Sequence, residues 1–362
     1  MKKLVSVLIA IACIVVVLGP VAQAAERQFS RSWLWDPNAV KMMDTSKYKK
    51  EPPYVIGFSN ASISNSWRVF FAREVQAEVE KQKDLIKKFY ITDAQDKPDK
   101  QIADTEDLVA KGIDLLIISA ATSAALDPIV TRVYKQGIPV VCADRRVTSE
   151  NFDSFVTSSS YAMGRMQMLW LCQMLKGKGN IVMLPGLAGA GPAEERITGG
   201  KEVLSQFPGV KLLDLQYTSW SPSEGKRIMA ALIQSYGKKI DGVWADSGLQ
   251  GSGAIEALVE AGMKVPITGD HLNAYLTRVQ KYEFPAMSIG FPVKMGAESV
   301  TTALKILQGI PVPFIVNVTR EVVTTVDTVD VKSDLPWDEW ARPDWPADWW
   351  IDNTLPEHWL PK

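Results

Sequence analysis

Charged side chains follow several apolar runs of this sequence, at the points where the predicted strands end. Asp144 and Arg145 come directly after one such run, and Asp246 and Asp270 come after two others. A carboxylate in such a loop accepts hydrogen bonds from adjacent hydroxyl groups, and a guanidinium donates in a planar fork. No metal-ligand cluster and no nucleophile with an adjacent base accompanies them. Since the chain has only two His and three Cys, these residues favour hydroxyl recognition over catalysis.

Two tryptophans and one loop add to this set. Trp67 and Trp220 are candidates for flat apolar walls against the C–H face of a polyhydroxylated ring, although Trp67 could instead pack at a helix start. The Gly-rich loop 186–191 suggests a dinucleotide site, but it is out of register with G-x-G-x-x-G. Glu194 and Glu195 at the following helix start would repel a pyrophosphate. We therefore expect no cofactor.

The elements that position these residues alternate between strands and helices. We expect strands at 54–59, 86–91, 113–119 and 138–142, and again at 180–184, 210–217, 242–245 and 266–269. Helices are expected at 67–83, 99–111, 126–135, 193–206, 223–236 and 251–261. Alternation of this kind predicts parallel sheets covered on both faces.

The alternating pattern occurs twice. The spacing from Asp114 to Asp144 is 30 residues, and that from Asp241 to Asp270 is 29. The fold prediction is therefore α/β, with two similar doubly wound parallel-sheet domains. Ligands of such sheets bind beyond the carboxyl ends of the strands, where the polar loops lie.

The first 24 residues have the features of a cleaved secretory signal. A basic start precedes an apolar run at 4–18, and the small-x-small pattern of a cleavage site ends at Ala24. The run has about 15 residues, fewer than the roughly 20 of a membrane-spanning helix. Cys142 and Cys172 remain after cleavage, and we interpret them as buried apolar residues, with a disulfide between them as the alternative. A net charge of −1 gives no basic face for nucleic acid.

Several of these residues carry a resemblance to a known family. Its motifs match four places in this sequence: Gly57-Phe58-Ser59 with the later Trp67-Arg68, the pair Asp144-Arg145, Arg196 after the Gly-rich loop, and Asp270 after Thr268-Gly269. From 54 to 331 the chain resembles the ribose-binding-protein-like group of periplasmic sugar-binding proteins of ABC importers, and is most similar to galactofuranose-binding-type proteins. Ser247, Gly290 and His271 depart from the usual Asn, Gln and Gly, which leaves the ligand's identity open.

The resemblance implies a periplasmic binding protein of type I, with a hinge of three crossings near 157–160, 289–290 and 320–321. The implied division is a signal peptide (1–24), an N-terminal extension (25–53), an N-terminal sugar-binding lobe (54–157 plus 291–319), a C-terminal lobe (158–289 plus 321–331) and a Trp- and Pro-rich tail (332–362). We expect the tail to be an irregular strap that packs its indoles on the domains, or else a partner-docking element.

The implied function is capture of a monosaccharide or sugar alcohol by hinge closure, and delivery to the membrane permease of an ABC importer. A periplasmic sensor for a chemoreceptor or histidine kinase is the alternative. We expect a periplasmic monomer that is not an enzyme and binds no metal. His271 is left as a ligand contact or a satisfied loop residue. The predicted ligand-binding residues are Asn65, Trp67, Arg68, Asp144, Arg145, Arg196, Trp220, Asp246, Ser247, Gln250 and Asp270.

Overall fold

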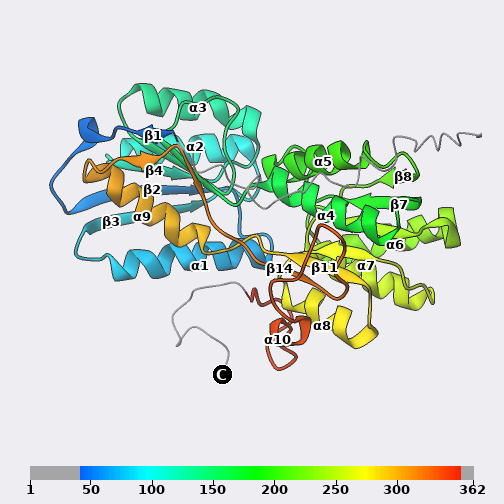
Figure 1. The fold of residues 1–362 in the computed structure, drawn as a ribbon. Coiled ribbons are helices and arrows are strands. Elements are labelled where there is room, and N and C mark those ends of the chain that lie inside the picture. Colours follow the sequence, from blue (N-terminus) through cyan, green and yellow to red (C-terminus); the bar gives the residue numbers. More distant parts are fainter. Residues whose placement is uncertain (1–40, 352–362) are drawn as a thin grey trace, which may run out of the picture.

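Two α/β units lie side by side, each built on a six-stranded sheet with helices on both faces (Figure 1). This computed structural model describes residues 41–351, so the predicted signal peptide and the last residues of the tail lie outside the described part. The predicted fold class is confirmed. We call the two units the N-terminal lobe and the C-terminal lobe.

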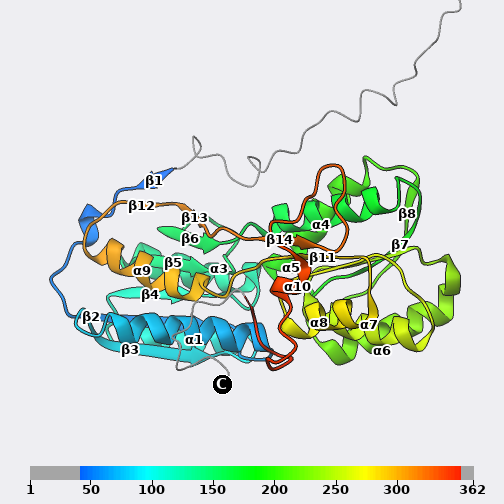
Figure 2. The same ribbon diagram turned by 60° about the horizontal axis from the view of Figure 1, so that its bottom comes forward.

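The sheet of the N-terminal lobe has the order β13-β6-β5-β4-β2-β3, and every neighbouring pair is parallel. In chain order its strands are β2 (Tyr54–Asn60), β3 (Ile86–Asp93), β4 (Leu115–Ile118), β5 (Val140–Ala143), β6 (Ser154–Thr157) and β13 (Ile315–Asn317). Its helices are α1 (Ser66–Lys81), α2 (Pro98–Ala110), α3 (Ser123–Lys135) and α9 (Met295–Leu307). Helix α1 packs beside α9 (Figure 2), and α2 packs beside α3. An apolar core lies on each face of the sheet, and the core beneath α1 and α9 is continuous with the core of the C-terminal lobe.

The sheet of the C-terminal lobe has the order β14-β11-β10-β9-β7-β8, with only β14 antiparallel to its neighbour. Its strands are β7 (Gly179–Leu184), β8 (Val210–Leu215), β9 (Gly242–Ala245), β10 (Ile267–Gly269), β11 (Ala286–Ile289) and β14 (Val322–Thr324). Its helices are α4 (Ser160–Met174), α5 (Gly191–Leu204), α6 (Pro222–Tyr236), α7 (Gly248–Glu260) and α8 (Asn273–Tyr282).

Short elements complete the described chain. Strand β1 (Met42–Met43) pairs antiparallel with β12 (Val312–Pro313). Two 3-10 turns, η3 (Ser46–Tyr48) and η4 (Gly237–Lys239), and one short helix, α10 (Trp337–Trp340), are the others. Within residues 41–351, no helix combines the length and the apolar character that crossing a bilayer would need.

The chain passes between the two sheets three times: from β6 to α4, from β11 to α9, and from β13 to β14. The loops at the carboxyl ends of both sheets face one another, since residues from both sets line one cavity. The domain boundaries given above stay predictions.

Helix α7 begins at Gly248, three residues earlier than expected. The Oγ of Ser247 accepts a hydrogen bond from the backbone N of Leu249 at 3.2 Å, which caps the helix and lets it start directly after β9. Cys142 and Cys172 are buried and free, so the disulfide alternative is not realised.

Candidate functional site

A cavity of about 30 Å³ lies between the two lobes, at the carboxyl ends of both sheets. Nine of its twelve lining residues belong to the predicted set, and the other three are apolar. The predicted lining residues are Asn65, Trp67, Arg68, Asp144, Arg145, Arg196, Trp220, Ser247 and Asp270. The three that the sequence analysis missed are Pro192, Leu249 and Phe291.

A tight turn after β5 aims Asp144 and Arg145 at the cavity. Asp144 has a φ of +62°, and the backbone N of Arg145 donates to the carbonyl of Ala143 at 2.7 Å. This is a three-residue γ-turn, in a conformation that side-chain-bearing residues rarely adopt. Strain of this kind persists where the surroundings hold it in place, and it is common at ligand sites.

The Asp144 carboxylate forms a buried ion pair with Arg68 of α1. Arg68 Nη2 lies 2.5 Å from Asp144 Oδ2, and Nη1 donates to Ser119 Oγ at 2.9 Å. Asn65 fixes the start of this helix, because its Oδ1 accepts a hydrogen bond from the backbone N of Arg68 at 3.0 Å. The N-terminal lobe therefore presents a carboxylate already held by one guanidinium.

Arg145 is the second guanidinium on this side. Its Nη1 donates to the Ala121 carbonyl at 3.3 Å and lies 3.5 Å from Asp96 Oδ1. Burial, together with the charge of Arg68, lowers the pKa of Arg145 to about 9, so the side chain stays protonated at neutral pH. Its Nε lies 3.7 Å from Asp144 Oδ2 but makes no hydrogen bond among the described residues, so it keeps a proton to donate.

Asp246 organises the facing side of the cavity from behind. Its Oδ1 accepts from Trp220 Nε1 at 3.0 Å and from Gln250 Nε2, and its Oδ2 accepts from the backbone N of Gly186 at 3.1 Å. The Asp246 carbonyl accepts from Arg196 Nη1 at 3.1 Å. Asp246 and Gln250 were predicted to contact ligand, but they do not line the cavity, because these bonds turn their polar groups into the lobe.

Trp220 is held against the Gly-rich loop. It has a φ of +50°, which is unusual for a bulky residue, and a Cβ at Gly186 would lie only 1.9 Å from its indole. Gly186 is therefore required for the close approach of the tryptophan. The need to accommodate this indole explains the glycine at the start of the loop, so no phosphate ligand is required to explain it.

Asp270 and Arg196 complete the charged groups of the C-terminal lobe. Asp270 Oδ1 accepts from the backbone N of Gly248 at 2.6 Å, and burial raises the pKa of this carboxyl to about 7, although Arg196 opposes the rise. Arg196 lies on α5, which packs closely against α4. Gly164 of α4 permits this approach because it has no Cβ; a Cβ there would lie 2.0 Å from the Arg196 carbonyl oxygen. The Nε of Arg196 has no hydrogen-bond partner in the described part of the chain.

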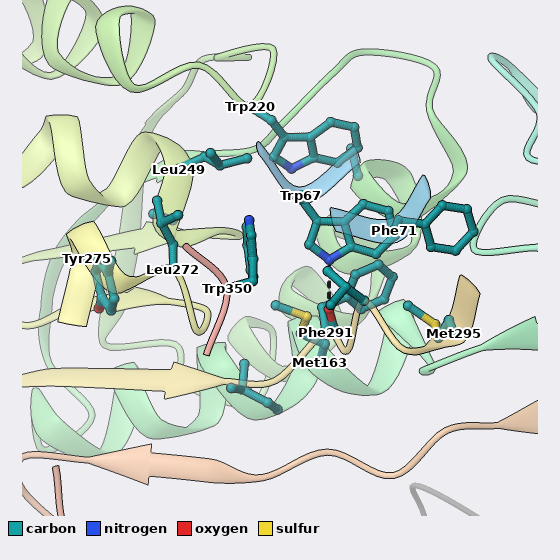
Figure 3. Packing of buried hydrophobic residues seen from close by; sticks show 14 of the residues in the cluster. Trp67, Phe71, Met163, Trp220, Leu249, Leu272, Tyr275, Phe291, Met295 and Trp350 are labelled. Atoms are coloured by element: carbon teal, nitrogen blue, oxygen red, sulfur yellow. Dashed lines mark hydrogen bonds between the residues drawn. The ribbon is translucent and has the colours of Figure 1, made fainter. Parts of the chain in front are cut away.

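Aromatic rings form most of the apolar part of the wall, together with Pro192 and Leu249; Figure 3 shows Trp67, Trp220, Leu249 and Phe291. Trp67 Nε1 donates to the Phe291 carbonyl at 2.8 Å, and its ring stacks on Phe71 with 5.1 Å between centroids. Arg196 lies over the Phe291 ring at 4.3 Å. The sequence feature that could have identified Phe291 is its position directly after the predicted crossing near 289–290, where the chain passes the cleft between the lobes.

His271 does not line the cavity. It is fully buried, and its Nδ1 and Ser288 Oγ are 2.7 Å apart. Burial lowers the pKa of His271 to about 3, so its ring is neutral. Its Nε2 has no hydrogen-bond partner among the described residues, so the satisfied-loop alternative fits this placement only at Nδ1. Among residues 41–351, no group of three or more His, Cys, Asp or Glu side chains could hold a metal ion.

The arrangement suits a neutral ligand with several hydroxyl groups. Two carboxylates and three guanidiniums converge from both lobes, with donors to spare on Arg145 and Arg196. Indole and phenyl rings bound the rest of the space, as they would against the C–H face of a ring. Each lobe supplies only part of the lining, so full contact requires both.

Comparison with known proteins agrees with this geometry. The model of the family described as "Periplasmic binding protein domain" matches residues 56–311. The galactofuranose-binding protein YtfQ of Escherichia coli is 30% identical over 218 residues, which are 59% of this chain and 68% of that protein. The fructose-binding periplasmic domain of a hybrid two-component system is 31% identical, with a TM-score of 0.69 over 75% of this chain and 91% of that one. An ABC transporter solute-binding protein from Bacillus halodurans with bound myo-inositol is 26% identical, with a TM-score of 0.70 over 76% and 96% of the two chains.

Proposed function

The chain belongs to the periplasmic binding protein domain family, and we propose on this premise that it is an extracytoplasmic solute-binding protein that captures a monosaccharide or sugar alcohol. One observation carries the proposal. Asp144 and Arg145 of one lobe and Arg196 and Asp270 of the other line a single buried cavity. The named ligands of relatives, a furanose sugar, fructose and myo-inositol, are all neutral polyhydroxylated molecules.

Binding would proceed by closure of the lobes around the ligand. A sugar hydroxyl donates to Asp144 or Asp270, while Arg145 and Arg196 donate through Nε atoms that make no hydrogen bond within the protein. Because the groups come from both lobes, all bonds form together only when the lobes meet. The ligand therefore shifts the population toward the closed arrangement by its higher affinity for that state.

Delivery to the membrane permease of an ABC importer follows from this proposal, with the protein acting as a monomer and leaving the ligand chemically unchanged. The exported chain would begin near Ala25, after removal of the signal peptide. A sensor role is the second candidate, because one similar structure is the fructose-binding periplasmic domain of a hybrid two-component system. Co-purification with a permease or with a kinase distinguishes the two.

A thermal-shift screen tests the proposal. The panel comprises D-ribose, D-fructose, L-arabinose, D-galactose, xylitol and myo-inositol, with NAD as a nucleotide control. A ligand that binds only the native state increases the free energy of unfolding by mass action, by about 2.7 kcal/mol at a concentration 100 times Kd. The melting temperature rises as a result. We expect at least one member of the panel, and not NAD, to stabilise the protein and to be recovered unaltered. A screen in which only NAD stabilises, or a ligand released in altered form, would overturn the proposal.

A further inference from the structure

The tail folds back from the hinge and runs along the C-terminal lobe. We call residues 337–351 the strap. Trp337 Nε1 donates to the carbonyl of Leu276 in α8 at 3.1 Å. At the first turn of α8, the Asn273 side chain donates to the Arg342 carbonyl at 2.8 Å, and the backbone N of Ala274 donates to the Ala347 carbonyl at 2.7 Å. The strap is thus fixed to the C-terminal lobe largely by its own main chain.

Two side chains of the strap cross to the other lobe. Trp350 Nε1 donates to Ser66 Oγ at 3.1 Å, and Trp349 packs edge-on against Phe70 with 4.6 Å between ring centroids. Ser66 and Phe70 both belong to α1 of the N-terminal lobe. Trp350 is fully buried, and Figure 3 places it between Leu272 and the Trp67–Phe291 pair. Between residues 41 and 351 the strap is therefore a further link between the lobes, in addition to the three crossings.

The link ends beside the ligand cavity. The first turn of α1 carries Trp67 and Arg68, which line the cavity, and α8 begins three residues after Asp270. Moving the lobes apart would separate α1 from α8. The contacts of Trp349 and Trp350 with α1 would then break, because their backbones are bonded to α8 and its preceding loop: Asn273 N donates to the Trp349 carbonyl at 2.9 Å.

We propose that Trp349 and Trp350 are positioning residues for ligand binding, which act through α1 to favour the closed arrangement of the lobes. This inference rests on the proposed function. A pre-existing closed population raises apparent affinity, since the observed Kd is the intrinsic Kd divided by the competent fraction. The strap also slows ligand release, because opening must break an aromatic contact and a hydrogen bond that no ligand provides.

The first test needs no ligand. Small-angle scattering measures the radius of gyration of the ligand-free protein as wild type, as Trp349→Leu, as Trp349→Phe and as the control Trp337→Phe. Trp337 is also a buried strap tryptophan, but its hydrogen bond stays within the C-terminal lobe. We expect a larger radius for Trp349→Leu, with wild-type values for Trp349→Phe, which keeps the ring contact, and for the control. An unchanged radius for Trp349→Leu would overturn the inference.

Variants of α1 in the N-terminal lobe test the same contacts if the strap variants do not fold. Ser66→Ala and Phe70→Leu remove the α1 side of the same two contacts and should enlarge the radius in the same way. With whichever of D-ribose, D-galactose or myo-inositol stabilises the protein, stopped-flow release should quicken about fivefold in Phe70→Leu, which loses an aromatic pair. Ser66→Ala, which loses a hydrogen bond, should quicken release by a similar factor. Release that is unchanged in both variants would overturn the inference, whereas a failed ligand screen would count against the proposed function alone.

Discussion

The guanidinium of Arg145 lies over the indole of Trp220, 5.4 Å from the ring centroid, and this contact joins the two lobes across the cavity. Arg145 follows β5 in one lobe, whereas Trp220 follows β8 in the other. Asp246 and Gly186 fix the indole from behind. A cation over the face of a tryptophan is worth about 0.5–2 kcal/mol, more where water is excluded. The lobes therefore meet through residues of the candidate site itself.

Substitution of Gly186 should displace Trp220. The Cβ of Gly186→Ala would lie 1.9 Å from the indole, so the ring must move out of its place in the cavity wall. We expect calorimetry to show at least a tenfold loss of affinity, which is about 1.4 kcal/mol. Ala188→Ser, an exposed position in the same loop, is the matched control. Equal affinity in both variants would mean that the ligand does not use Trp220.

Breaking the buried pair of Arg68 and Asp144 should destabilise the protein. Asp144→Ala leaves the Arg68 guanidinium buried without its carboxylate, and loss of one partner of such a pair typically costs about 3–5 kcal/mol. Urea unfolding measures the change in the free energy of unfolding. The double variant Arg68→Met, Asp144→Leu should lose less than Asp144→Ala. A loss below about 1 kcal/mol in Asp144→Ala would contradict a buried charged pair.

The pH dependence of stability should reflect Asp270. Burial raises the pKa of this carboxyl to about 7 from an ordinary value of 3.8. The folded state thus holds the proton more tightly than the unfolded state, and this contribution is complete below about pH 4 and is lost as the pH rises through 7. Ligand-free wild type should lose melting temperature over that window relative to Asp270→Asn. Parallel pH profiles for the two proteins would refute the raised pKa.

The two described cysteines should be chemically silent in the native protein. Burial raises the pKa of both Cys142 and Cys172 to about 12, so neither carries a thiolate at pH 8. Ellman's reagent should react with them only after unfolding in guanidinium chloride. Rapid reaction of the folded protein would show that one of these sites opens to solvent.

Much of the fold could be predicted because its signals are local. Alternating apolar runs and helical faces mark β2–β5, β7–β10, α1–α3 and α5–α7, whereas β6, β11, β13, β14, α8 and α9 were not anticipated. The carboxyl-end rule then places Asp144 and Asp270 near one cavity. What could not be predicted are hydrogen-bond partners that are distant in the chain. Asp246 follows β9 as Asp270 follows β10, yet the backbone N of Gly186, 60 residues away, turns the Asp246 carboxylate into the lobe.

The strap illustrates the same limit. Its sequence is rich in Trp and Pro and lacks any periodic pattern. It therefore indicated an irregular segment but not where on the two lobes that segment would pack. The partner of Trp350 is Ser66, 284 residues earlier, and nothing near either residue marks the other. Phe291 was missed for a related reason, because an apolar residue after a crossing serves a core and a ligand wall equally well.

Calorimetry of two arginine variants tests the central claim most directly, with the sugar or sugar alcohol that most raises the melting temperature. Arg145→Met removes a donor from the N-terminal lobe and Arg196→Met one from the C-terminal lobe, while Arg132→Met, an exposed ion-pair residue far from the cavity, is the control. A lost hydrogen bond to a charged group costs about 1.5–3 kcal/mol, so each cavity variant should bind at least about tenfold more weakly. The control should bind as wild type does. Wild-type affinity in both Arg145→Met and Arg196→Met would contradict capture of the ligand between the two lobes.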